Sequence, residues 1–277
     1  MTPEDLEGLI ALGATIDWQM IPENWLFTLR SFPRHSFVAE KDGRIIGSAV
    51  SYHYPPETAV ISKVIVAHPF RRIGIAGNLI RRLMNSYPAG TSFMLDSSPH
   101  GTELYRKLGF TNSDFPGIRK LRTFDFKLPP QDSGEQALPL AASDLPEILR
   151  MDHEISGLNR AAVLEEYFST APELAFKMVK QGKLTGFCLG NRSGICREVC
   201  PLIAGDAADA KRLFRKAVEA DSNHGIILDV PEIHNDFLDF LHAGSMTELM
   251  PLIRMQKGNL PKFNPDHYFS LLGSNLT

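Results

Sequence analysis

The chain of 277 residues has few cysteines, no long apolar run and no excess of positive charge. Its cysteines, Cys188, Cys196 and Cys200, are too few and odd in number for a disulfide framework, and no second Cys or His pair accompanies them at zinc-ligand spacing. No stretch reaches the roughly 18 apolar residues that a membrane span needs. A net charge of −3 provides no positive field for nucleic acid. We therefore expect reduced thiols, no metal, and neither a membrane nor a nucleic-acid partner.

The first residues, MTPEDLEGLI, are acidic and lack the long apolar core of a signal peptide. We therefore expect a cytoplasmic protein.

The chain does contain a basic, glycine-bearing turn between an apolar strand and an amphipathic helix, within residues 64–84. The turn runs from Arg71 to Ala76 and has the form R-x-x-G-x-A. Its small residues let a ligand approach the backbone. The first N–H groups of the helix, at the positive end of its dipole, then form a site for phosphate or pyrophosphate. An ordinary strand-to-helix turn is the alternative interpretation, because short glycine patterns also occur by chance.

A second informative segment, residues 93–110, reads FMLDSSPHGTELYRKLGF. A short apolar strand ends at Asp96, and a turn follows it. A short helix then carries Tyr105 and stops before Gly109, because glycine is the expected residue just past a helix end. The alternative interpretation of Tyr105 is a half-buried aromatic side chain on an amphipathic helix.

Together the two segments resemble the GNAT acetyltransferase family, with its pyrophosphate loop Q/R-x-x-G-x-G/A and its later LYxKxGF segment. The resemblance implies that the turn holds the pyrophosphate of acetyl-CoA as cosubstrate, and that the preceding strand pairs with the pantetheine arm. It implies that a backbone N–H near Val66 polarises the thioester carbonyl, and that Tyr105 protonates the departing thiolate. The expected cofactor-binding residues are Val64, Ile65, Val66, Arg71, Arg72, Ile73, Gly74, Ile75, Ala76 and Gly77.

The general base stays open at this stage. Asp96 is our catalytic candidate, and Glu57 and His100 are the others. Each has a simpler explanation: Asp96 caps the following helix, Glu57 is an exposed loop residue, and His100 is a solvated turn residue. His68, next to the loop, is a candidate phosphate contact.

The rest of the first half predicts helices near residues 3–12 and 22–29 and strands over 36–40, 44–52, 60–67, 91–96 and 120–128. This is the order of elements in the GNAT family, except that the N-terminal strand often found in that family is not predicted here. Trp18 and Trp25 are expected to be packing residues near the acceptor cleft. The prolines, polar residues and glycine within residues 129–140 predict a linker. We therefore predict an α+β fold with mixed sheets in two tandem GNAT domains, over residues 1–128 and 141–277.

The second half repeats this order of elements. Its segments GLNR at 157–160, PLIA at 201–204 and LDVP at 228–231 resemble, in their order and spacing, the C-terminal domain of the YitH-like group of tandem GNAT proteins. The second half lacks a usable pyrophosphate loop, because Asp206 would place a negative charge where the pyrophosphate should bind. Cys200 stands where that group usually has a Gly before the Pro at position 201. Asp152 is the candidate for binding a cationic acceptor, and a structural pair with Arg160 is its alternative role.

The sequence thus predicts an acetyl-CoA-dependent N-acetyltransferase that acts on the amine of a small molecule, as a monomer or a homodimer. A non-catalytic acyl-CoA sensor and a protein or peptide N-acetyltransferase are the alternatives. Acidic residues lining the acceptor groove would favour the peptide enzyme. The second domain is expected to be a structural or acceptor-binding partner rather than a second catalytic centre.

Overall fold

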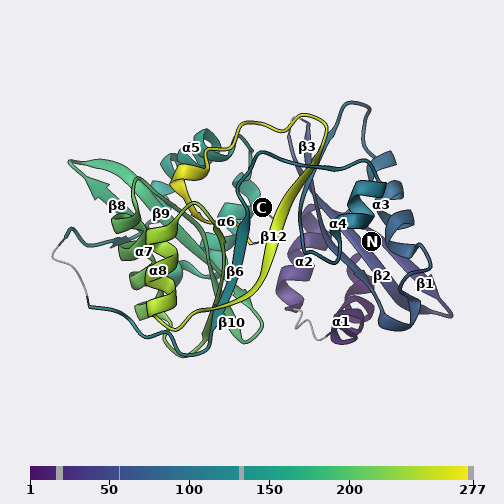
Figure 1. Cartoon of the computed structure of the whole chain (residues 1–277), viewed down its shortest axis with the longest axis horizontal. Helices are drawn as coiled ribbons and strands as arrows, with labels where there is room; N and C mark the ends of the chain where they lie inside the picture. Colours follow the sequence, from purple (N-terminus) through teal and green to yellow (C-terminus); the bar gives the residue numbers. More distant parts are fainter. Residues whose placement is uncertain (17–20, 56, 131–133, 274–277) are drawn as a thin grey trace. The chain divides into compact units, whose positions relative to one another are not determined.

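The computed structural model describes residues 1–16, 21–55, 57–130 and 134–273, which form two compact units (Figure 1). Unit 1 contains Met1–Ser113 and Met255–Leu260. Unit 2 contains Asp114–Arg254 and the described residues from 261 onward. Both units combine helices with a mixed sheet, which confirms the predicted fold class. Trp18 and residues 131–133 of the predicted linker lie outside the described residues.

Unit 1 follows the predicted order of elements as far as helix α4. Its helices are η1 (Pro3–Asp5), α1 (Leu6–Ala14), α2 (Pro22–Ser31), η2 (His68–Phe70), α3 (Ile75–Asn85) and α4 (Thr102–Lys107). Its strands are β1 (Phe37–Lys41), β2 (Arg44–Tyr54), β3 (Thr58–Val66), β4 (Ser92–Ser97) and the short β5 (Thr111–Asn112).

The sheet of unit 1 has the strand order β1-β2-β3-β4. The first two pairings are antiparallel and the third is parallel. Asp42 and Gly43 both have positive φ, at 50° and 70°, so the predicted Asp-Gly turn joins β1 to β2. Helix α3 packs on β1, β2 and β3 with Leu79, Ile80 and Leu83 buried, which matches the spacing of an amphipathic helix.

Unit 2 contains the remaining elements. Its helices are η3 (Ala142–Asp144), α5 (Leu145–Ser156), α6 (Ala161–Thr170), η4 (Pro172–Leu174), α7 (Ala207–Ala220), α8 (Asn235–Ala243) and η5 (Pro265–His267). Its strands are β6 (Ile118–Thr123), β7 (Leu138–Pro139), β8 (Phe176–Lys180), β9 (Lys183–Ser193), β10 (Cys196–Ala204), β11 (Gly225–Pro231), most of β12 (Thr247–Lys257), and β13 (Tyr268–Ser270).

The sheet of unit 2 runs β12-β6-β11-β10-β9-β8-β7, and β13 pairs with β10. Helix α7 lies beside β8, β9 and β10 and contacts α8 (Figure 1). It buries Ala210, Leu213, Phe214, Ala217 and Val218, whose helical spacing forms one apolar face toward the core. In the part of the chain that the structure describes, no helix is both long and apolar enough for a bilayer crossing.

The division into units differs from the predicted boundary at residues 129–140. The strand predicted over 120–128 is β6, and it pairs with β11 and β12 in unit 2. In return, Met255 and Gln256 of β12 pair with β5 in unit 1. Alternating residues identify a strand but not its partner, because pairing is decided by tertiary packing. Each half of the sequence therefore supplies strand residues to the unit formed mainly by the other half.

Candidate acyl-CoA site

The candidate site begins where strands β3 and β4 separate. They pair in parallel at only three positions, from Thr58 opposite Ser92 to Val60 opposite Met94. Beyond Val60, no described strand pairs with this edge of β3. Val64, Ile65 and Val66 lie on that edge, where an extended ligand could add as a strand, although the Val66 carbonyl already accepts from Arg71.

The predicted pyrophosphate loop follows this edge directly. Gly74 caps helix α3 with φ of 91°, and a side chain added there would meet no atom within 4 Å. Helix α3 has no side-chain N-cap, so its first N–H groups are not satisfied by a capping residue. Ile73 is 70% exposed, and Ala76 is half-buried. An open, left-handed glycine at an uncapped helix start suits an anion that approaches the backbone.

The two loop arginines lie on the surface at this helix start. Arg71 donates from Nε to the Val66 carbonyl at 3.0 Å, which ties the loop to the end of the open edge. Arg72 has φ of 67° and is close enough to α4 for its charge to help lower the pKa of Glu103, after the larger effect of the Lys107 hydrogen bond. Arg71 is thus held at the end of β3 and Arg72 lies toward α4, and their binding of a pyrophosphate stays a prediction.

Helix α4 brings Tyr105 to the same region. A side chain added at the buried Gly77 would lie 3.6 Å from Cδ1 of Leu104, so α4 packs against the first turns of α3. The Tyr105 ring is half-buried and packs edge-on against Phe110, with ring centres 5.9 Å apart. Burial raises the pKa of Tyr105 to about 12. Its hydroxyl has no hydrogen-bond partner among the described residues, so it is free to donate to a ligand.

The other sequence candidates lie around this region in different settings. Asp96 is half-buried near the end of β4 and has interactions within the protein. Glu57, His68 and His100 are all exposed. Glu57 lies in the turn before β3, where its carbonyl accepts from the Ser92 N–H at 2.8 Å. The assignment of a general base stays a prediction.

Strand β10 of unit 2 has the same geometry as β3 of unit 1, but a later segment of unit 2 occupies the edge that is open in β3. In β3, Lys63 and Val64 form a bulge between the paired residues Ser62 and Ile65. In β10, Cys200 and Pro201 form the matching bulge between Val199 and Leu202. Strand β10 also leaves its parallel partner β11 after three pairs, ending at Glu198 opposite Ile227. By this register, Leu202 and Ile203 of β10 correspond to Ile65 and Val66 of β3.

Strand β13 occupies the equivalent edge in unit 2. Ser270 pairs with Leu202, and Tyr268 pairs with Ile203. On its other side, the Leu271 N–H donates to the Asp229 carbonyl of β11 at 2.8 Å. The segment thus fills the gap between β10 and β11 at the positions where β3 presents an unpaired backbone. The sequence reasoning did not find β13, whose three residues carry too short a pattern to predict a strand.

The N-termini of the equivalent helices, α3 in unit 1 and α7 in unit 2, also differ between an open and a filled state. Asp206 caps α7, and its Oδ1 accepts from the Asp209 N–H at 2.8 Å. That backbone hydrogen bond lowers the pKa of Asp206, and the nearby Lys180 lowers it further. A carboxylate therefore caps the helix start in unit 2, whereas Gly74 stands at the equivalent position in unit 1.

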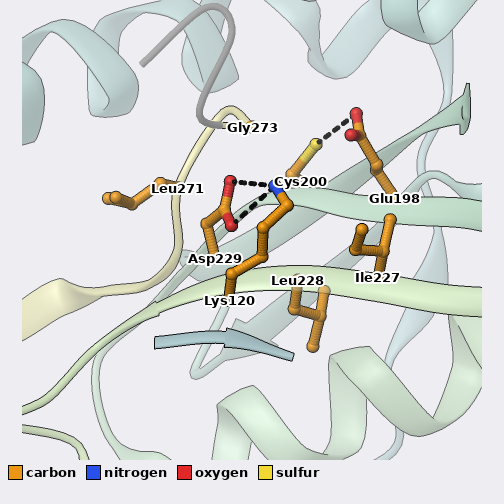
Figure 2. A pocket seen from close by; sticks show the side chains of 8 residues that line it. All are labelled: Lys120, Glu198, Cys200, Ile227, Leu228, Asp229, Leu271 and Gly273. Carbon is orange, nitrogen blue, oxygen red and sulfur yellow. Dashed lines mark hydrogen bonds and ion pairs between the residues drawn. The ribbon is translucent and has the colours of Figure 1, made fainter. Parts of the chain in front are cut away.

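A narrow pocket lies in unit 2 beside the bulge of β10 (Figure 2). Lys120 donates to both carboxylate oxygens of Asp229 at 3.1 and 3.3 Å, and the Cys200 thiol points toward Glu198. Burial would lower the pKa of Lys120, but the charges of Asp229 and Glu198 outweigh it and raise the pKa. Burial and the same two carboxylates raise the pKa of Cys200. The thiol therefore stays protonated and is not a nucleophile.

Asp152, the candidate for acceptor binding, is buried in unit 2 together with Arg160. Its carboxylate accepts from Arg160 Nε at 3.1 Å and from Nη2 at 2.5 Å, and both side chains are at most 1% exposed. The guanidinium lies 5.2 Å from the centre of the Tyr268 ring, and Tyr268 belongs to β13. This is the structural pair that the sequence reasoning gave as the alternative role. The pair lies under the segment that fills the edge of β10.

Replacing Asp152 by Asn should lower the free energy of unfolding by about 2 kcal/mol, because the buried guanidinium loses a charge-assisted bond. Chemical denaturation of the whole chain measures this change. The Michaelis constant for the amine acceptor should stay within about twofold, since removing a buried pair does not remove a ligand contact. A large rise in that constant at unchanged stability would instead support the acceptor-binding role.

Comparison with known proteins agrees with this geometry. The profile of the Acetyltransferase (GNAT) family matches residues 11–110, and that of an Acetyltransferase (GNAT) domain matches residues 148–270. The chain is 24% identical over 173 residues to a holothin acyltransferase from Pseudoalteromonas sp. (strain SANK 73390). That alignment covers 61% of this chain and only 56% of the relative.

Two solved structures share the fold along nearly the whole chain. A candidate acetyltransferase from Pyrococcus horikoshii superposes with a TM-score of 0.80 at 20% identity, covering 100% of this chain and 94% of the other. A tandem GNAT protein from the clavulanic acid biosynthesis pathway gives a TM-score of 0.66 at 11% identity, covering 95% and 98%. The chain belongs to the GNAT family and contains two tandem GNAT domains. The described residues contain no cluster of His, Cys, Asp and Glu suited to a metal ion.

Proposed function

We propose that this protein is an acetyl-CoA-dependent N-acetyltransferase that acetylates the amine of a small molecule, with catalysis in unit 1. The observation that carries the proposal is the edge of β3 from Val64 to Val66, which no described strand pairs with and which leads into the uncapped start of α3. An extended pantetheine arm and an adjoining pyrophosphate are the ligand parts that such an edge and helix start fit.

The residues of unit 1 would divide the chemistry as follows. The loop backbone from Ile73 to Gly77, with Arg71 and Arg72, holds the pyrophosphate. The edge of β3 holds the arm and presents an N–H to the thioester carbonyl. The acceptor nitrogen forms a bond to the acyl carbon and loses a proton to solvent water as the carbon–sulfur bond breaks. Tyr105 donates to the sulfur that leaves, and solvent restores its proton.

Unit 2 takes a supporting role in this proposal. Strand β13 fills the edge of β10 that would receive a pantetheine arm, and Asp206 satisfies the helix start that would receive a pyrophosphate. The names of two similar proteins, from holothin and clavulanic acid chemistry, favour a small acceptor molecule.

Titration of acetyl-CoA into the whole protein by calorimetry should give one binding site per chain, because β13 fills the edge of β10 and no described strand pairs with the edge of β3 beyond Val60. Free thiol released during incubation with a panel of amines then measures turnover. Two sites per chain would contradict the assignment of unit 2. One site without turnover on any amine would favour the sensor, and no binding at all would overturn the proposed function.

A further inference from the structure

Lys63 is the only charged residue in strand β3, and it lies at the bulge where the expected acyl end of the site begins. Its φ is 47°, a left-handed conformation that is unusual for a residue other than glycine. The Ser48 hydroxyl donates to the Lys63 carbonyl at 2.8 Å, which holds the bulge against β2. Bulges of this kind often redirect a side chain next to an active site. Sequence reasoning passed over Lys63, although a lysine within an apolar strand was a visible signal.

The Lys63 ammonium lies in a cage of aromatic rings and hydroxyl groups. Nζ is 4.9 Å from the centre of the Trp25 ring and 5.1 Å from that of the Tyr52 ring. It donates to Thr28 Oγ1 at 2.9 Å and to the Tyr52 hydroxyl. These three wall residues are fully buried, whereas Lys63 itself is only half-buried. The cage therefore fixes the ammonium while leaving part of it accessible.

The hydrogen bonds of the cage leave one donor of Lys63 unused. Thr28 gives its own hydroxyl hydrogen to the Asn24 carbonyl at 2.9 Å, so the Tyr52 hydroxyl donates to Thr28 Oγ1, also at 2.9 Å. Both oxygens then accept from Lys63, which uses two of its three N–H groups. Among the described residues, no carboxylate forms an ion pair with Nζ. The cage supplies ring faces and neutral oxygens but no counter-charge.

We propose that Lys63 binds a carboxylate of the acceptor, so that the substrate class is an amine that also carries a carboxylate, such as an amino acid. This inference rests on the proposed function. The residue after Lys63 is Val64, the first residue of the edge that would hold the arm, so the ammonium lies near the thioester end. A half-desolvated cation with a free N–H attracts an anion more strongly than an exposed lysine does.

The bulge of β10 in unit 2, which corresponds to the bulge at Lys63, has a different set of charged side chains. Cys200 stands there, with Glu198 beside it and the Asp229 charge close enough to raise its pKa. The Lys120 ammonium near this bulge already pairs with Asp229, so unit 2 neutralises its cation with a carboxylate of its own. A cation at the bulge of unit 1 also argues against an acidic groove for a lysine-bearing peptide, which was the alternative acceptor.

The test compares acceptors that differ only in the carboxylate. The probes are alanine, leucine, phenylalanine and glutamate, each as the free acid and as its α-methyl ester, assayed by thiol release with acetyl-CoA. Wild type should turn over at least one free acid with kcat/KM about tenfold or more above that of its ester. Lys63→Met should raise the KM of the acid about tenfold, leave the KM of the ester within about threefold, and bind acetyl-CoA as wild type does.

Two further variants separate recognition from a structural role. Lys63→Arg keeps the charge and should retain part of the preference for the acid. Lys41→Met removes a lysine that also lies over a ring, 5.4 Å from the centre of Phe70, and should retain the full preference. The proposal is overturned if Lys63→Met keeps the acid-to-ester ratio of wild type, or if no free acid turns over while acetyl-CoA binds. Failure of wild type to bind acetyl-CoA would overturn the proposed function instead.

Discussion

Replacing Tyr105 by Phe should lower kcat about 100-fold and leave the Kd for acetyl-CoA within about twofold. The substitution keeps the ring that packs against Phe110 and removes only a hydroxyl that has no hydrogen-bond partner among the described residues. Its pKa of about 12 lies more than three units above the roughly 8.5 of an ordinary thiol, so full proton transfer to a thiolate is uphill. We therefore expect the lower end of the usual acid-catalysis range.

The pH dependence follows from the same pKa. Because the pKa of Tyr105 is raised, the hydroxyl keeps its proton until the pH approaches 12. Rates measured from pH 6 to 10 should then give wild type and Tyr105→Phe the same dependence on pH at the alkaline end. An alkaline limb near pH 8 to 9 that is present in wild type and absent in the variant would contradict this assignment.

Tyr87→Phe is the matched control for Tyr105→Phe. Tyr87 is also in unit 1, and its pKa is raised to about 12 by burial, but its hydroxyl already bonds to Ser51 Oγ at 2.7 Å. Loss of that hydroxyl should lower the free energy of unfolding by about 1 kcal/mol and leave kcat within about twofold of wild type. Equal losses of kcat in both variants would indicate a general effect of unit 1 rather than acid catalysis.

Replacing Gly74 by Glu should weaken acetyl-CoA binding at least about 100-fold. A carboxylate at the start of α3 would lie within a few ångströms of the pyrophosphate, where like charges repel by about 4 kcal/mol near a protein surface. The left-handed φ of 91° adds about 1 kcal/mol of backbone strain for any residue with a side chain. Calorimetric titration measures the affinity directly.

Gly43→Glu separates the two effects in this experiment. Gly43 also has positive φ, at 70°, and also has no atom within 4 Å of an added side chain, but it lies in the β1–β2 turn. It should lose a similar amount of stability and keep the wild-type affinity. If both variants bind acetyl-CoA equally well, the loop does not hold the pyrophosphate.

Much of the fold could be predicted from local patterns. The Asp-Gly turn, the apolar spacing of α3 and α7, and Gly109 with φ of 86° after α4 are properties of neighbouring residues, and the structure has them where the sequence places them. The loop from Arg71 to Gly77 could also be predicted, because a basic glycine turn before a helix is a pattern of only a few neighbouring residues.

The partners of these elements were decided only by tertiary structure. The sequence by itself determined a strand near β6 and another near β12, but not that β6 would enter unit 2 or that Met255 would pair with β5. It showed that the negative charge of Asp206 would repel a phosphate, but not that β13 would pair with the nearby edge of β10. Pairing, burial and the Lys63 cage join residues far apart in the chain, and the free energy of such contacts depends on packing that no local pattern contains.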